Sequence, residues 1–148
     1  MTANDPVNYP SHYTDGPSLG KLECLDITRW MPFTLGNAFK YVWRAGKKNP
    51  ANFVEDLRKA RFYLFDWDYI PLGYNTLLFH GRPVAVALFL KSDFRQWPPW
   101  QYRALRAIIE GDVEVAIGEI DQQIKAAEAA ADEVFRRYEP EDETDDPD

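Results

Sequence analysis

The sequence has few of the residues that build disulfides and zinc sites, with one cysteine and two histidines. The single cysteine, Cys24, cannot form an internal disulfide, which is typical of a protein in a reducing compartment. It lies in the segment 22–27 among apolar residues, so we expect a buried thiol rather than a nucleophile. His12 and His80 supply too few further ligands for the usual zinc sites.

Long apolar runs and the common catalytic motifs are also missing. The longest unbroken apolar run, 84–90, is much shorter than the roughly 20 residues that span a bilayer, so we predict no contact with a membrane. The N-terminal part of the sequence has no basic segment followed by an apolar stretch, so we predict no secretion signal. The pattern Gly-x-x-x-x-Gly-Lys-Ser/Thr is absent, which excludes an ordinary P-loop, and no Gly-x-Gly-x-x-Gly or nucleophile elbow is visible.

The negative charge of the chain is concentrated at one end. Residues 139–148 hold seven of the 24 acids, and the remaining acids balance the 17 lysines and arginines. A body without net charge lacks the basic surface of a nucleic-acid-binding protein, so we predict no specific nucleic-acid partner. The acidic tail cannot form a core, and we expect it to be disordered.

The sequence pattern predicts a mainly α protein, a small helical domain with an irregular N-terminal arm. Residues 1–67 are expected to form one module, made of an arm rich in turn residues over 1–20 and three helices. Residues 68–138 are expected to pack on this module or to form an oligomer seam, and 139–148 form the tail. Within the second part, 76–90 fits a β-hairpin around Gly81-Arg82-Pro83, although its apolar run could equally start a buried helix.

The longest predicted helix follows Asp112, which is placed to cap it, and runs to Tyr138. Apolar residues recur along it at alternating spacings of four and three, which gives an unbroken heptad seam. The seam residues are Val113, Ile117, Ile120, Ile124, Ala127, Ala131, Val134 and Tyr138. Such a seam either docks along a neighbouring helix of the same chain or pairs between subunits, so a homo-oligomer is expected.

A short segment, 36–48, is expected to form a helix that presents positive charge, with Gly46 in the left-handed position that closes the helix after Ala45. Lys40, Arg44 and Lys47 fall on one helical stripe, and Asn37, Tyr41 and Lys48 fall on an overlapping stripe with Arg44. The apolar residues Phe39, Val42 and Trp43 can face inward and anchor the helix. This surface would suit a phosphate-bearing small molecule. It could equally be a solvated face, with bases that complement the dipole at a helix C-terminus.

Two further clusters could complete a nucleotide site. Glu55 and Asp56 are adjacent carboxylates at a helix start, and Mg²⁺ prefers oxygen ligands. Acids are also favourable in the first turn of any helix, which is the simpler explanation of this pair. Ser11, His12 and Tyr13 offer hydrogen-bonding side chains in the arm, although His12 could instead make a structural hydrogen bond there.

Taken together, these segments resemble a small tailed-phage protein family that was long catalogued as a phage domain of unknown function. The similarity covers about residues 5–67 and lies in four ordered motifs, DPVNYPSHY (5–13), LECLD (22–26), GNAFKYVWRAGKK (36–48) and EDLRKARFYL (55–64). The family includes the nucleotide kinase of a T-odd coliphage, which lacks a P-loop. Tyr9 departs from the commoner pattern, in which this position is His.

The resemblance implies phosphoryl transfer from a nucleoside triphosphate such as ATP to a deoxynucleoside monophosphate, in the cytoplasm of an infected bacterial host. Such transfer depends mainly on positioning and charge neutralisation. Arg44, Lys47 and His12 would be the catalytic residues. The residues expected to bind the nucleotide are Ser11, Tyr13, Asn37, Lys40, Tyr41 and Lys48. Glu55 or Asp56 would hold Mg²⁺ directly or through water.

Three other functions remain compatible with the residues. A non-catalytic nucleotide binder, or an effector of host metabolism, would use the same cationic surface without turnover. An oligomeric interaction protein would use the heptad helix as its functional surface. A helical nucleotide pyrophosphohydrolase normally needs several acids on paired helices, for which only Glu55-Asp56 is a start.

Overall fold

Helices form all the regular structure in the part of the chain that is described, which comprises residues 7, 22–71, 73–91, 95 and 97–139 of a computed structural model. No strand occurs among these residues, so the mainly α prediction is confirmed. The helices are α2 (Cys24–Thr28), α3 (Phe33–Arg44), the 3₁₀ turn η1 (Pro50–Asn52), α4 (Phe53–Asp68), α5 (Tyr74–Leu78), α6 (Arg82–Phe89), α7 (Pro99–Glu110) and α8 (Val113–Tyr138). The predicted arm, apart from Val7, and the acidic tail after Glu139 lie outside the described residues.

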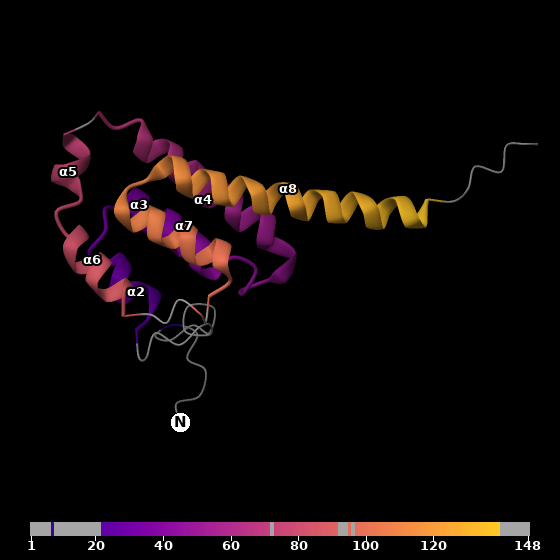
Figure 1. Cartoon of the computed structure of the whole chain (residues 1–148), viewed down its shortest axis with the longest axis horizontal. Helices are drawn as coiled ribbons and strands as arrows, with labels where there is room; N and C mark the ends of the chain where they lie inside the picture. Colours follow the sequence, from indigo (N-terminus) through magenta and orange to yellow (C-terminus); the bar gives the residue numbers. More distant parts are fainter. Residues whose placement is uncertain (1–6, 8–21, 72, 92–94, 96, 140–148) are drawn as a thin grey trace, which may run out of the picture.

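The core is built by four helices that contact one another in a ring. Helix α3 packs on α4, α4 on α8, α8 on α7, and α7 on α3, while α2 and α6 close one end (Figure 1). One continuous apolar cluster runs from Cys24 on α2 to Ile120 on α8. Side chains from both sides of residue 67 therefore share the same core.

Helix α3 is anchored by the inward-facing residues that its spacing predicts. Phe39 and Val42 are fully buried, and Trp43 is nearly so. The helix starts after Pro32 and ends where Gly46 adopts a left-handed φ of 72°, as predicted for this glycine. A side chain at this φ would be strained, so glycine is the residue that suits the turn.

The end of α3 is also held by a residue from the second half of the chain. Gln101 on α7 is buried, and its Nε2 donates to the carbonyl oxygens of Val42 at 2.9 Å and Trp43 at 3.2 Å. The last carbonyls of a helix have no partner within the helix, so a buried helix end needs outside donors. Gln101 supplies them, and it thereby ties α7 to the last turn of α3.

The predicted β-hairpin near 76–90 is wrong, because this segment forms α5 and α6. Pro83 lies in the first turn of α6, where its missing N–H is no loss. Ala85 and Phe89 are four residues apart and both fully buried, which is a helical rather than an alternating pattern. The run from Val84 to Leu90 is apolar at every position, so it fits the helical and the alternating pattern equally well, and tertiary packing decides between them.

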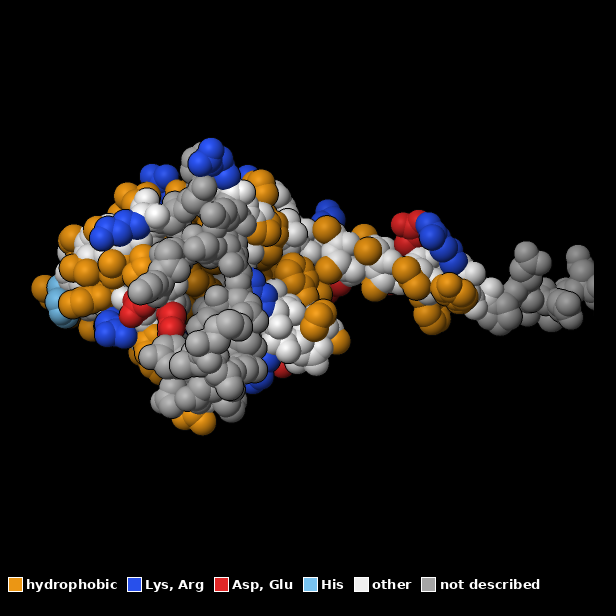
Figure 2. Space-filling view, turned by 90° about the horizontal axis from the view of Figure 1, so that it is seen from below, with side chains coloured by type: hydrophobic (Ala, Val, Ile, Leu, Met, Phe, Trp, Pro, Cys, Tyr) orange, Lys and Arg blue, Asp and Glu red, His pale blue; other side chains and the backbone are white. Residues whose placement is uncertain are grey.

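Helix α8 fulfils the heptad prediction over its first half only. Asp112 caps it, its carboxylate accepting the backbone N–H of Val115 at 3.3 Å. The seam is buried or half-buried against α4 and α7 from Val113 to Ile124. Farther on, α8 projects beyond the other helices, and its exposed apolar side chains are visible near its end (Figures 1 and 2). Val134 is 54% exposed there and Tyr138 82%.

No described helix is both long enough and apolar enough to cross a membrane. This agrees with the short apolar runs of the sequence.

Candidate functional site

The ring of Tyr41 gathers three cations from two helices. Lys40 Nζ lies 4.5 Å, Arg44 Cζ 4.7 Å and Lys59 Nζ 5.7 Å from the ring centroid. Cations at this distance are attracted by the negative face of an aromatic ring. The structure thus brings together Lys40, Tyr41 and Arg44 of the predicted stripes. It adds Lys59 of α4, which the sequence gave no reason to select.

Arg44 is held by the buried carboxylate of Asp56. Its guanidinium lies 3.3 Å from Asp56 Oδ1, and the two side chains are only 12% and 5% exposed. The second carboxylate oxygen accepts the backbone N–H of Gly46 at 3.3 Å. Asp56 therefore compensates the charge of Arg44 and fixes the turn after α3. The Nε of Arg44 is buried and makes no hydrogen bond.

Lys40 has a different environment, because no ion pair among the described residues involves it. Its ammonium donates to Asn37 Oδ1 at 3.0 Å, and the Asn37 amide in turn donates to the Phe33 carbonyl at 2.9 Å. Burial lowers the pKa of Lys40, and the nearby charge of Arg44 lowers it further. Lys40 is thus a positive group that is held in place by an amide rather than neutralised by an acid.

Glu55 and Asp56 do not form a joint carboxylate site. Glu55 is exposed and binds Lys59 of the next turn at 2.6 Å, whereas Asp56 points inward to Arg44. The hydrogen bond from Lys59 lowers the pKa of Glu55. No cluster of three metal-ligating side chains occurs among the described residues. Direct coordination of Mg²⁺ by either carboxylate would require an existing ion pair to break, so these two residues do not fit a ready-made metal site.

An aromatic series continues from Tyr41 along the same face. Tyr63 of α4 stacks on Tyr41 with centroids 6.0 Å apart and ring planes at 11°. Tyr63 also meets Phe33 at 6.4 Å and Phe62 at 5.4 Å, both edge to face. Phe33 is 79% exposed and Phe62 68%, so the series ends in open aromatic surface. No local sequence pattern indicates this series, because its rings come from both α3 and α4.

The remaining cations of the predicted stripes, Lys47 and Lys48, have different surroundings. Lys47 Nζ is 5.0 Å from the ring centroid of Trp97, and Lys48 is exposed. Burial raises the pKa of Cys24 to about 12, although the charges of Lys40 and Lys47 oppose the rise. The thiol is 2% exposed and protonated at neutral pH, as predicted for a buried cysteine.

Ser11, His12 and Tyr13 lie outside the described residues. Their predicted part in nucleotide binding and catalysis stays a prediction. The described site thus consists of Lys40, Arg44 and Lys59 around Tyr41, together with Tyr63, Phe33 and Phe62, and we call it the α3–α4 face.

Comparison with known proteins gives a family without a known function. Residues 7–65 match the family "protein of unknown function (DUF3310)". The match includes α2, α3 and most of α4, and therefore every residue of the α3–α4 face. It covers less than half of the chain and ends before α5. No curated protein and no solved structure matches the chain.

Proposed function

We propose that the α3–α4 face binds a nucleotide, and that the protein transfers a phosphoryl group from a nucleoside triphosphate to a deoxynucleoside monophosphate. The observation that carries nucleotide binding is the convergence of Lys40, Arg44 and Lys59 on Tyr41, next to an exposed aromatic series. A nucleotide combines an anionic phosphate with a flat base, and this face offers a partner for each. The transfer step rests on the resemblance of residues 5–67 to the phage family.

The three cations differ in how readily they can accept a phosphate. Arg44 is held in a nearly buried pair with Asp56, and breaking such a pair leaves an uncompensated buried charge. Lys59 is paired with Glu55 in solvent, where ion pairs contribute little. Lys40 has no carboxylate partner among the described residues. Lys40 and Lys59 would therefore contact the phosphate. Arg44 would attract the phosphate through its nearby positive charge and would hold the Tyr41 ring in place through its cation–π contact.

The base would stack on the exposed end of the aromatic series, at Phe33 or Phe62. Stacking of a base on an aromatic side chain contributes about 1–3 kcal/mol and does not depend strongly on which base is bound. This agrees with a sequence that gives no sign of base preference. Asn37 accepts a hydrogen bond from the Lys40 ammonium, so its role would be to position that lysine rather than to bind the base.

Phosphoryl transfer on such a face would rely on positioning and charge neutralisation. ATP is the proposed donor, and Mg²⁺ would arrive with its phosphates, since Glu55 and Asp56 are both engaged by cations. Lys47 and His12 would add donors at the edge of the site. The reaction would take place in the cytoplasm of an infected bacterial host, where replication consumes deoxynucleotides.

A non-catalytic nucleotide binder is the second candidate function. Glu55 and Asp56, which contact Lys59 and Arg44, are both engaged by these cations, so neither of the two is a free general base. The same face would then hold a nucleotide without turnover.

The decisive experiment combines a binding measurement with a product assay. The protein is incubated with ATP, Mg²⁺ and each deoxynucleoside monophosphate, and diphosphates are measured by chromatography while thermal shift reports binding. Diphosphates that are lost in Lys40→Met and kept in Lys125→Met, an exposed lysine of α8, would support transfer on this face. Binding without product would leave the non-catalytic binder. No thermal shift with any nucleotide would contradict both.

We further propose that the projecting half of α8 pairs with α8 of a second copy, running antiparallel. The part beyond Ile124 is about 20 Å long. Glu128 near its start is paired with Arg58 of α4 at 2.5 Å, whereas the apolar side chains of Val134, Phe135 and Tyr138 farther on are exposed. The segment carries acids at Glu128, Asp132 and Glu133 and bases at Lys125, Arg136 and Arg137. Antiparallel pairing brings the basic end of one copy beside the acidic stretch of the other, whereas parallel pairing sets like charges together.

A further inference from the structure

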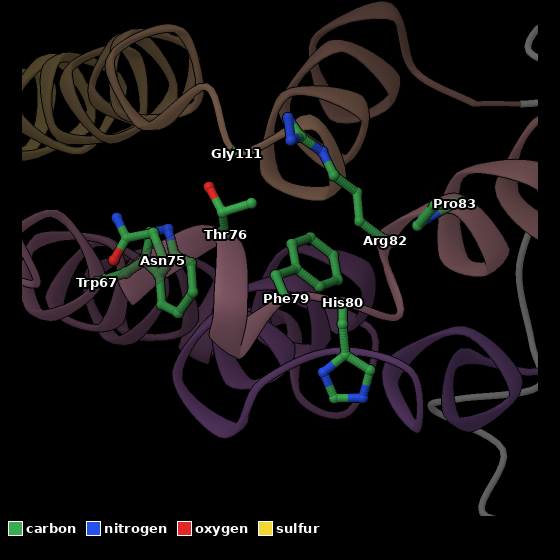
Figure 3. Close-up of a pocket in the computed structure, with 8 residues that line it drawn as sticks. All are labelled: Trp67, Asn75, Thr76, Phe79, His80, Arg82, Pro83 and Gly111. Carbon is green, nitrogen blue, oxygen red and sulfur yellow. The ribbon is translucent and has the colours of Figure 1, made fainter. Parts of the chain in front are cut away.

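A pocket of about 500 Å³ lies at the C-terminal end of α4. It is bounded by the end of α4, by α5, by the start of α6 and by the turn between α7 and α8 (Figure 3). Trp67, which lines it, follows Tyr63 of the α3–α4 face by about one helical turn, but none of the residues that line the pocket belongs to that face. The pocket is therefore separate from the site proposed for nucleotides. Its volume is in the range of pockets that hold small organic ligands.

One wall of the pocket carries a positive charge that no described acid neutralises. Arg82 extends from α6 to the α7–α8 turn beside Gly111, and its guanidinium donates to the backbone carbonyl of Glu110 (Figure 3). No ion pair of the described residues includes Arg82. A carbonyl fixes the direction of the side chain but carries no net charge. The guanidinium thus keeps its full charge at the edge of the pocket, with donors to spare.

The other walls are aromatic and carry hydrogen-bonding groups. The rings of Trp67 and Phe79 are 4% and 6% exposed and line the pocket. In Figure 3 Thr76 lies between Trp67 and Arg82, and Asn75 lies beside Trp67. The side-chain oxygen of Asn75 is buried and has no hydrogen-bond partner. A buried acceptor without a donor is costly, and a donor group on a ligand would remove that cost.

We propose that this pocket binds a small aromatic anion. Its carboxylate or phosphate would bind Arg82, because a guanidinium matches the two oxygens of either group with parallel N–H donors. Its flat ring would lie against Trp67 and Phe79. A hydroxyl or amino substituent on the ring would donate to Asn75. His80 also lines the pocket, and its Nδ1 lies 3.3 Å from the carbonyl oxygen of Leu77.

The test uses ¹⁹F NMR of the full chain with three probes of one size. These are 4-fluorobenzoate, 4-fluorophenyl phosphate and the neutral 4-fluorobenzyl alcohol. We expect the ¹⁹F line of at least one anion to broaden at millimolar concentration and that of the alcohol to broaden much less. The two anions compared with each other show whether the natural ligand is a carboxylate or a phosphate ester.

Variants assign the binding to this pocket. Arg82→Gln keeps a donor for the Glu110 carbonyl but removes the charge, and we expect anion affinity to fall at least tenfold. Arg106→Gln on α7 makes the same change at an arginine outside the pocket and should bind like the wild type. If Arg82→Gln does not fold, Thr76→Phe offers a second route, since an added ring fills the pocket and should abolish binding.

Three outcomes would overturn this assignment. They are equal broadening of the charged and neutral probes, equal anion binding in Arg82→Gln and Arg106→Gln, and no broadening of any probe. None of them bears on the α3–α4 face, because Arg82 and Thr76 lie outside it.

Discussion

Arg44 and Asp56 join the last turn of α3 to the first turn of α4 through an ion pair of 3.3 Å that is almost closed to solvent. The same carboxylate holds the backbone N–H of Gly46, so one aspartate fixes both the turn and the guanidinium beside Tyr41. The geometry of the α3–α4 face therefore depends on an acid that we expected to bind metal. Its main effect on function would be to position Arg44.

Asp56→Asn should lower the free energy of unfolding by about 3 kcal/mol or more. Removing one partner of a buried ion pair leaves the other charge buried and uncompensated. Urea unfolding followed by circular dichroism measures the loss. Glu55→Gln, which breaks the neighbouring exposed pair with Lys59, is the matched control and should change stability very little. Equal effects of the two substitutions would contradict the difference in burial.

Cys24 should make the protein less stable as the pH rises above 9. Burial raises the pKa of its thiol from 9.0 to about 12. Between these values the unfolded chain releases the proton and the folded chain keeps it, so the free energy of unfolding falls. The stabilising effect is complete below pH 9 and is lost as the pH rises toward 12. Urea unfolding at pH 7, 9 and 10.5 measures the fall.

The control for this effect is Cys24→Ala, which has no group to titrate at this position. Its stability is expected to be lower at pH 7, because a buried atom is lost, but to fall less steeply with pH than that of the wild type. Parallel slopes for the two proteins would show that the thiol does not contribute.

Lys40 should give nucleotide binding an unusual dependence on pH. Its pKa is lowered, mainly by burial and then by Arg44, so it loses its charge at a lower pH than an ordinary lysine. We expect affinity for a deoxynucleoside monophosphate to decrease on the alkaline side, measured by calorimetry from pH 7 to 10. Lys40→Arg should flatten the profile, because arginine keeps its charge throughout this range. An unchanged profile in that variant would mean that Lys40 does not contact the phosphate.

Phe62 tests the aromatic end of the α3–α4 face. Phe62→Ala should weaken nucleotide binding by about 1–3 kcal/mol if the base stacks there. Phe65→Ala is the control, because Phe65 is half-exposed on the same helix but contacts Arg61 rather than the Tyr63 ring. Calorimetry measures the nucleotide affinity of both variants. Equal losses of affinity would show that the base does not stack on Phe62.

The projecting half of α8 should determine the oligomeric state. Val134→Glu introduces a charge into the exposed seam and should convert a dimer into a monomer, as measured by size-exclusion chromatography with light scattering. Val115→Glu adds the same charge to α8 at an exposed position outside the seam and should leave the dimer intact. A wild-type protein that is monomeric at high micromolar concentration would refute the pairing.

The sequence was sufficient for features that depend on neighbouring residues. The inward face of α3, the left-handed Gly46 and the cap at Asp112 all follow from local spacing and from residue chemistry. The prediction of a hairpin near 76–90 was wrong because the wholly apolar run 84–90 fits the helical and the alternating pattern equally well. Only the packing of α6 on α2 and α7 distinguishes them.

The candidate site was predicted in part for the same reason. Lys40, Tyr41 and Arg44 share a helix, so their proximity was visible in the sequence. Lys59 and Tyr63 reach Tyr41 only because α3 and α4 pack together. Glu55 and Asp56 were expected to act together, but adjacent positions on a helix point about 100° apart, and here one faces solvent and the other the interior.

Gln101 has a practical consequence for anyone who would study the first 67 residues alone. Cutting the chain after α4 would remove the two hydrogen bonds that Gln101 gives to the end of α3, and it would uncover the apolar sides of α3 and α4. Such a fragment would expose apolar surfaces that promote aggregation, and the end of α3 beside Arg44 would be frayed. A failed binding assay on it would then report poor folding instead of a missing activity.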